Sequence, residues 1–382
     1  MLRFMYSGIS GMKVNQNKLD VVGNNIANVS TTAFKSSSAR FTDMLYQNAG
    51  TATAPTSNKG GTNAKQVGLG AKLSSINRVM SQGNALSTGR SLDVCIDGEG
   101  YFMAGVGPND YTTSSTKIKS DMSVDGGNMQ ITYTRDGNFT LDKDGNLLTA
   151  DGRRVLGYLL KSYDKDGKEF GANSSINLAT DTVTDDSVSP KLAIGDVMFV
   201  DADGTLKAVG DDDSGDPTNL ELQPLKIPDK VYVPAISGDS NSKSSWQKVA
   251  SFAIGKDGVI TAVLANGKKT ALGQIATATF TNPEGLTAIG GNYFEVSPNS
   301  GAELIRTSVN IDKKKTGEVR TDKLVDNSKA FGDSVQGCLE ASNVDLTEQF
   351  TDMISATRSF QASSKLITTG DEILQTITGL LR

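Results

Sequence analysis

The chain ends in a helix-forming stretch, residues 346–381, whose sequence is LTEQFTDMISATRSFQASSKLITTGDEILQTITGLL. Large apolar residues recur at every seventh position; the repeating set is Leu346, Met353, Phe360, Ile367, Leu374 and Leu381. We assign Phe350 to the same apolar seam. A seven-residue apolar repeat predicts a helix with one narrow apolar seam, as in a coiled coil. Asp345 and Glu348 are typical of the start of such a helix. We therefore expect a long C-terminal helix that must pack against a partner.

The opposite end of the chain carries a matching pattern over residues 2–28. Its apolar residues follow alternating steps of three and four, with Gln16 and Gly23 in the gaps; they are Leu2, Met5, Ile9, Met12, Leu19 and Ile26. Glycines inside this segment each cost about 1 kcal/mol relative to alanine, so packing must stabilise the helix. A single amphipathic helix would most often cover a core. Two seams at opposite ends instead predict that the ends pair with each other and with those of other copies.

The middle of the chain predicts β-structure. It is punctuated by Asp-Gly pairs, which favour hairpin turns, at Asp97, Asp125, Asp136, Asp144, Asp151, Asp166, Asp203 and Asp257. Short runs of β-formers, such as residues 130–134 and 259–263, lie between these turns. We therefore predict a multidomain α+β fold, in which the terminal helices pair as a coiled-coil inner domain and mainly antiparallel β-domains are inserted between them.

Composition suggests how this fold is divided. We expect a terminal helical domain (1–29 and 343–382), an extended connector (30–75 and 326–342), a first β-domain (76–159 and 266–325) and an outer, variable β-domain (160–265). The connector is rich in Ser, Thr, Gly and Asn, which predicts irregular chain. The outer segment carries 10 Lys and Arg against 17 Asp and Glu, so it is the acidic part of a chain with net charge −5.

The chemistry of the side chains argues against catalysis. The chain holds no histidine, which excludes Ser-His-Asp catalysis and histidine zinc sites. Acidic residues surround Cys95, but the alternating apolar residues there favour a strand entering a turn. Residues 142–146 have half of a calcium-loop spacing without the closing glutamate. Cys95 and Cys338 lack metal-site spacing, and a single bridge between them stays open. We expect no enzyme activity, no cofactor and no metal.

The sequence also limits the partners of the chain. No basic patch with interleaved aromatic residues supports binding of nucleic acid. The sequence contains no run of about 18 apolar residues, so we expect no insertion into a membrane. The N-terminus lacks the uninterrupted apolar core of a secretory signal, because serines and glycines interrupt it at residues 7–11.

Several motifs closely resemble the signature of the bacterial flagellar axial proteins, the rod and hook family. At the N-terminus they are residues 7–12, 19–29 and 31–35, whose motif residues are Asn24, Asn25, Asn28, Thr31, Thr32, Phe34 and Lys35. The match continues at residues 133–139 and 280–286, and residues 339–346 are similar to the start of the family's C-terminal helix. Residues 160–265 show no recognisable family motif.

The resemblance implies a structural role. Length and residues 347–350 (Thr-Glu-Gln-Phe) resemble the hook members, which polymerise into a curved, flexible tube that transmits motor torque from rod to filament. The implied partners are further copies of the chain, the distal rod, the hook cap scaffold, the hook–filament junction protein and the flagellar export apparatus. The implied location is the basal body and hook, outside the cell. Alternatives are a distal rod subunit and, from another class, an extracellular β-rich adhesin or enzyme.

Two residues depart from the family pattern. Ala33 stands where glycine is usual, and a backbone position with positive φ would resist alanine, which puts the local turn in question. Cys95 stands where a small apolar residue is usual.

Overall fold

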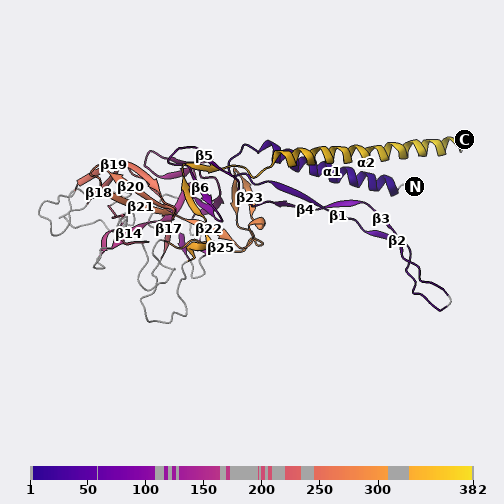
Figure 1. The fold of residues 1–382 in the computed structure, drawn as a ribbon, viewed down its shortest axis with the longest axis horizontal. Coiled ribbons are helices and arrows are strands. Elements are labelled where there is room, and N and C mark those ends of the chain that lie inside the picture. The colour runs from indigo at the N-terminus through magenta and orange to yellow at the C-terminus, as the bar shows by residue number, and fades with distance from the viewer. Residues whose placement is uncertain are drawn as a thin grey trace. The chain divides into compact units, whose positions relative to one another are not determined.

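The computed structural model describes residues 3–57, 59–107, 116–118, 123–125, 129–163, 169–172, 197, 199–202, 205–208, 220–233, 245–308 and 327–380. The chain forms two compact units. The helical unit comprises Met1–Ser81 and Ser342–Arg382, and the β unit comprises Gln82–Ala341 (Figure 1). Both ends of the chain therefore belong to the same unit, as the matching seams predict.

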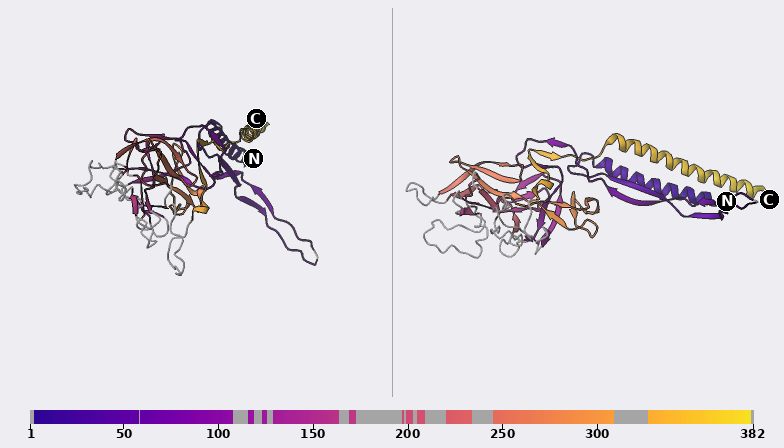
Figure 2. Two further views of the ribbon diagram at one scale, coloured as in Figure 1. Left: turned by 60° about the vertical axis from the view of Figure 1, so that its left-hand side comes forward. Right: turned by 60° about the horizontal axis from the view of Figure 1, so that its bottom comes forward.

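The helical unit is built on two antiparallel helices, α1 (Arg3–Ala27) and α2 (Leu346–Leu380), which lie side by side in both views of Figure 2. The 35 residues of α2 span about 52 Å at 1.5 Å per residue. Asp345 caps α2, since its Oδ1 accepts hydrogen bonds from the backbone N–H of Thr347 at 2.8 Å and of Glu348 at 3.4 Å. Neither helix, over its described residues, is apolar enough to cross a membrane.

A long β-hairpin follows α1, where we predicted irregular connector. It pairs β1 (Ser37–Asp43) with β4 (Ala71–Arg78) and β2 (Tyr46–Gly50) with β3 (Lys65–Gly68), all antiparallel. Exposure alternates along β1 and β4, and both strands pack against α1. The expectation of irregular chain over 30–75 was wrong because small polar residues hide the two-residue period when the strands have few apolar side chains.

The turn between α1 and β1 keeps the left-handed conformation despite its alanine. Ala33 is buried and has a φ of 56°, in a region that costs roughly 1–2 kcal/mol for a residue with a Cβ. The left-handed turn that glycine usually forms in this family is therefore present at Ala33 as well, and the alanine Cβ strains the backbone there.

We expect Ala33→Gly to raise the free energy of unfolding of the helical unit by about 0.5–1 kcal/mol, because relief of this strain exceeds the entropy that glycine adds to the unfolded chain. Urea unfolding of the full chain, followed by far-UV circular dichroism, measures the change. Ala362→Gly on the exposed surface of α2 is the matched control and should lose about 1 kcal/mol. Equal losses in both variants would contradict a strained turn.

The β unit consists of antiparallel strands. Its largest sheet follows the order β18 (Lys230–Val233), β19 (Ser245–Ile254), β20 (Val259–Leu264), β21 (Lys269–Ile275), β13 (Arg154–Tyr158), β7 (Tyr101–Val106), β10 (Gln130–Thr134), β24 (Tyr293–Glu295) and β23 (Thr287–Gly290). Further strands branch from this path: β8 (Thr116–Ile118), β9 (Val124–Asp125), β11 (Phe139–Leu141), β12 (Leu147–Thr149), β17 (Glu221–Pro224), β22 (Thr277–Phe280) and β25 (Glu303–Ile305). Together with the two terminal helices, this confirms the predicted α+β fold.

Smaller sheets complete the β unit. They pair β5 (Ala85–Ser87) with β27 (Cys338–Glu340), β6 (Val94–Asp97) with β26 (Asp333–Gln336), and β14 (Leu160–Tyr163) with β15 (Glu169–Ala172) and β16 (Thr205–Ala208). Among the described residues, the short 3₁₀ turns Pro283–Gly285 and Ser328–Ala330 lie between strands.

One hydrophobic core crosses the predicted boundary between the two β-domains. Phe102 and Phe139 pack edge to face at 5.2 Å, in the same buried cluster as Leu225, Ile260 and Ile275. Strand β20 is hydrogen-bonded to β21 and β17 to β13, so the sheet also runs across residues 159–160 and 265–266. The division into separate β-domains stays a prediction. In the described residues, strands from the two parts pair in one sheet, and their side chains form one hydrophobic core.

Candidate self-assembly surface

The two helices approach closely because small residues face each other. A Cβ on Gly11 would lie 3.1 Å from Ser363 Oγ, and one on Gly8 would lie 3.3 Å from Ile367 Cγ1. Gly370 of α2 lies against the ring of Phe4, where a Cβ would come within 2.6 Å. Gly8 and Gly11 of α1 therefore allow the close pairing, although they weaken the isolated helix.

Polar contacts fix the register of the same helix pair. Lys18 Nζ lies 2.9 Å from Asp352 Oδ1, with both side chains partly exposed. Asn25 Nδ2 donates to Gln349 Oε1 at 3.0 Å, and Asn25 is fully buried. An amide pair without access to water is satisfied only in one alignment, so it specifies the register.

The row of α2 residues that faces α1 also repeats every seventh position. It comprises Gln349, Ala356, Ser363 and Gly370, of which all but Ser363 are buried. This facing row lies three positions after the predicted apolar row of α2. On α1 the facing residues, Gly8, Gly11, Lys18 and Asn25, precede predicted seam residues by one position. Small and polar residues therefore form the facing row of α2, and the apolar side chains of Phe4 and Ile367 pack beside it.

The predicted seam residues lie at the margin of this contact or outside it. Exposed members are Ile9, Leu346, Phe350 and Phe360, and half-buried members are Met5, Met12, Leu19, Ile26, Met353, Ile367 and Leu374. Leu2 and Leu381 lie outside the described residues. Their role in polymerisation stays a prediction, and the structure leaves much of the seam uncovered within one chain.

A second apolar row on α2 was missed in the sequence. Leu366, Ile373 and Leu380 are seven residues apart and 55%, 46% and 82% exposed. This row lies three positions after the facing row, whereas the predicted row lies three positions before it, so at about 100° per residue the two flank the α1 contact on opposite sides. The seven-residue spacing of this second row is visible in the sequence, but we assigned the apolar seam to the longer row one position later.

The family motif residues at the end of α1 hold the helical unit together. Asn25 links α1 to β1, since Asn25 Nδ2 donates to the Ser37 carbonyl at 2.8 Å and Ser37 N–H donates to Asn25 Oδ1 at 2.9 Å. Asn28 Nδ2 donates to the carbonyl and side-chain oxygens of Asn24, at 2.9 and 3.0 Å. Thr31 Oγ1 donates to Asn28 Oδ1 at 3.2 Å. These contacts end the helix and set the direction of the following chain.

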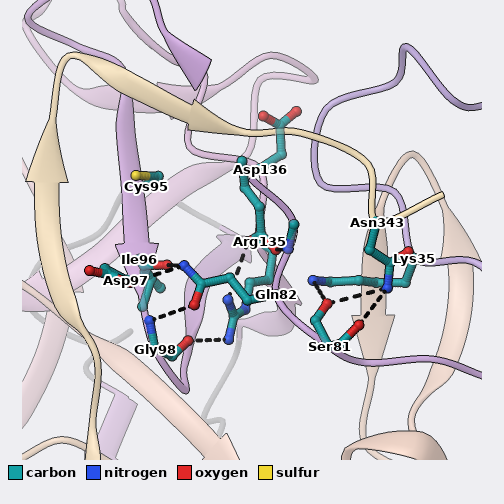
Figure 3. Close-up of polar contacts among 12 residues, drawn as sticks. Lys35, Ser81, Gln82, Cys95, Ile96, Asp97, Gly98, Arg135, Asp136 and Asn343 are labelled. Carbon is teal, nitrogen blue, oxygen red and sulfur yellow. Dashed lines mark hydrogen bonds and ion pairs between the residues drawn. The ribbon is translucent and has the colours of Figure 1, made fainter. Parts of the chain in front are cut away.

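The rest of the motif anchors the segment before α2. Lys35 is buried and its Nζ donates to the Ser81 carbonyl at 2.8 Å (Figure 3). Asn343 accepts a hydrogen bond from Ser36 N–H at 2.8 Å and donates to the Ser81 carbonyl at 3.3 Å. The Phe34 carbonyl accepts a hydrogen bond from Asn343 N–H at 3.4 Å, while Thr32 lies half-buried in the turn. The motif is thus structural in this chain.

We expect Gly11→Leu to lower the free energy of unfolding of the helical unit by about 1–3 kcal/mol, because the added side chain must displace α2 at Ser363. Far-UV circular dichroism during urea unfolding measures this loss. Gly23→Leu is the matched control: a Cβ there meets nothing within 4 Å, so the variant should gain up to about 1 kcal/mol from helix propensity. Losses of the same size in both variants would show that the close approach at Gly11 does not stabilise the pair.

Three family models match the chain. They are "Flagella basal body rod protein" over residues 5–35, "Flagellar hook protein FlgE/F/G D1 domain" over residues 122–262, and "Flagellar basal body rod FlgEFG protein C-terminal" over residues 335–380. The first and third match the helical ends. The second covers most of the segment in which we saw no family motif, so that expectation was wrong; the shared sheet and core agree with one continuous match.

Curated relatives match along their whole length. The chain is 35% identical over 382 residues to the flagellar basal-body rod protein FlgG of Bacillus subtilis, covering 100% of both. It is 29% identical over 479 residues to the flagellar hook protein FlgE of Borreliella burgdorferi, again covering 100% of both. It is 28% identical over 453 residues to FlgE of Escherichia coli, covering 97% of this chain and 98% of that protein. Among solved structures, the Helicobacter pylori flagellar hook protein FlgE2 matches at 14% identity and a TM-score of 0.34, covering 67% of this chain and 100% of that one.

Proposed function

Since this chain belongs to the family of flagellar rod and hook proteins, which are structural subunits, we propose that it builds the flagellar hook by polymerising through its terminal helices. In this proposal the hook is a curved, flexible tube that transmits motor torque from rod to filament. The chain acts as a mechanical element and not as an enzyme.

The observation that carries the proposal is the uncovered apolar surface of α2. Large apolar side chains flank the α1 contact on both sides, and several are nearly half exposed or more, among them Phe350, Leu366 and Ile373. Rows of exposed apolar residues on this scale mark interaction surfaces. Because one row lies on each flank, two further helices would cover them, and a subunit with such unlike contacts forms an open helical polymer.

The hook is favoured over the distal rod by the chain's own sequence. Residues 347–350 resemble hook members, and alignments to hook proteins of two organisms span 97–100% of this chain; the length of 382 residues, by contrast, agrees with the rod relative. The distal rod is the second candidate, favoured by the 35% identity to a rod protein over the full chain. A rod subunit would form a straight, stiff tube from the same surface.

The remaining partners follow from this role. Other copies of the chain would surround each subunit, the distal rod would lie below it and the junction protein above it, and a cap scaffold would hold the growing end. We propose that the flagellar type III export apparatus delivers the chain unfolded, and that the terminal helices order on assembly. The product would lie outside the cell.

Electron microscopy of basal bodies from cells lacking this chain tests the proposal. Rods that end bare, without a hook, would support it. Truncated or missing rods would assign the chain to the distal rod instead. Normal flagella would overturn both roles.

A further inference from the structure

The two cysteines of the chain meet although 243 residues separate them. Cys95 Sγ and Cys338 Sγ lie 3.0 Å apart, and the two residues are only 2% and 7% exposed. Cys95 lies in β6, opposite Val335 of β26, and Cys338 opens β27, opposite Ser87 of β5. Two pairs of hydrogen-bonded strands thus position the thiols against each other, so their meeting is part of the fold.

These strands stand where the chain enters and leaves the β unit. The first residues of the unit are tied to its last, since Gly83 N–H donates to Glu340 Oε1 at 2.8 Å and Ala341 N–H donates to the Asn84 carbonyl at 2.8 Å. Gln82 joins the same region, since its Nε2 donates to Asp97 Oδ1 at 3.2 Å and its Oε1 accepts from Gly98 N–H at 3.1 Å (Figure 3). A covalent bond between Cys95 and Cys338 would close the unit at its two ends.

We propose that Cys95 and Cys338 form an intramolecular disulfide that clamps the two ends of the β unit when the chain folds in an oxidising environment. The oxidant is a disulfide of the form RSSR, either a small molecule or a thiol–disulfide oxidoreductase. One cysteine thiolate attacks RSSR and releases one RS⁻; the second thiolate attacks the mixed disulfide and releases the other. Two cysteine thiols are oxidised, RSSR is reduced to two RSH, and the protons pass to the released thiolates.

The timing follows from burial. Burial raises the pKa of the Cys95 thiol to about 12, and the hydrogen bond with Cys338 and the nearby charges of Glu340 and Asp97 add to this shift. Because the thiolate is the reacting species, the folded and reduced protein exchanges slowly. Oxidation therefore belongs to the unfolded or folding chain. In the folded unit the two sulfurs need to close by only about 1 Å to reach the bonding distance.

The bond would matter most under tension. It closes a long loop, and cross-links of this kind stabilise by limiting the unfolded chain. This expectation rests on the proposed function. A force applied at residues 82 and 341 would be carried by the disulfide and would not separate the strands of the sheet. The chemistry is tested on the purified monomer, so it stands or falls independently of the hook assignment.

The test is refolding of the full chain from reduced, denatured protein into a mixture of oxidised and reduced glutathione. We expect both thiols to disappear, and a non-reducing digest to contain one linked pair of peptides carrying Cys95 and Cys338. Adding reductant should lower the Tm of the β unit by on the order of 10 °C. The Tm of Cys95→Ser and of Cys338→Ser should not respond to reductant, and each variant should keep one free thiol.

Three results would overturn the proposal. Two free thiols in the refolded chain after denaturation would show that the bridge does not form. Disulfide-linked dimers in place of an internal bridge would assign the cysteines to contacts between chains. Equally fast oxidation of folded and unfolded protein would contradict the protection of the buried pair.

Discussion

Phe360→Glu should stop polymerisation while the β unit stays folded. Phe360 is 36% exposed in the single chain, so the monomer tolerates a charge there, whereas a filament that covers this flank of α2 must bury it. Burying an unpaired charge costs several kcal/mol, so we expect the concentration needed for growth to rise by at least about 100-fold. Sedimentation and electron microscopy measure polymer, and the fluorescence of Trp246, the single tryptophan, monitors the β unit.

The matched control is Thr351→Glu on the exposed surface of the same helix. Nine residues place it about 180° around the helix from Phe360, so it adds the same charge on the opposite side of the helix. We expect Thr351→Glu to polymerise as the unaltered chain does. Normal filaments from Phe360→Glu would refute assembly through this flank, and loss of filaments in both variants would show only that α2 tolerates no added charge.

Glu340→Ala should lower the free energy of unfolding of the β unit by about 3–5 kcal/mol, because it leaves a buried guanidinium without its counter-charge. Arg135 Nη1 lies 3.2 Å from Glu340 Oε2, and the two side chains are 3% and 1% exposed. Arg135 Nη2 also donates to the Gly98 carbonyl at 2.6 Å, so the cation is held in place and cannot move out to water (Figure 3). Urea unfolding followed by Trp246 fluorescence measures the loss.

Two comparisons separate the parts of this effect. Glu340→Gln keeps an oxygen that can accept from Gly83 N–H but removes the charge, so its loss should be smaller than that of Glu340→Ala. Glu295→Ala, at an exposed position of the same unit, should change stability by less than about 0.5 kcal/mol. A loss below about 1 kcal/mol for Glu340→Ala would show that Arg135 is compensated by other means.

The sequence predicted the helices better than their contact. A seven-residue period marks a helix and its apolar seam wherever the residues are large, as at Met353, Phe360 and Ile367. The row of α2 residues that faces α1 contains Ser363 and Gly370, which contribute little to an apolar pattern. Glycine and serine allow close approach because they are small, and only the partner shows which small residues are used. The pairing of the ends was therefore predictable, and the rotation of each helix about its axis was not.

The β1–β4 hairpin and the continuous sheet of the β unit show a second reason why part of the fold could not be predicted from the sequence. Strands β1 and β4 pair residues about 30 to 40 positions apart, and β7 pairs with both β10 and β13. Such pairing depends on partners distant in sequence, which local propensity does not identify. The same holds for Cys95 and Cys338, whose spacing alone left a bridge open. Asn25 was identified from the family motif, but its role in joining α1, β1 and α2 required the fold.

The meeting of the first and last strands of the β unit also bears on how proteins of this kind diversify. A segment whose ends lie side by side can be enlarged without moving the points at which it joins its host, as in tolerated domain insertions. The alignments to hook relatives extend over 453 and 479 residues, against 382 in this chain. Residues added to the segment between β5 and β27 would leave the pairing of α1 with α2 in register. Evolution can therefore vary the size of the insert while the length and phase of the assembling helices stay fixed.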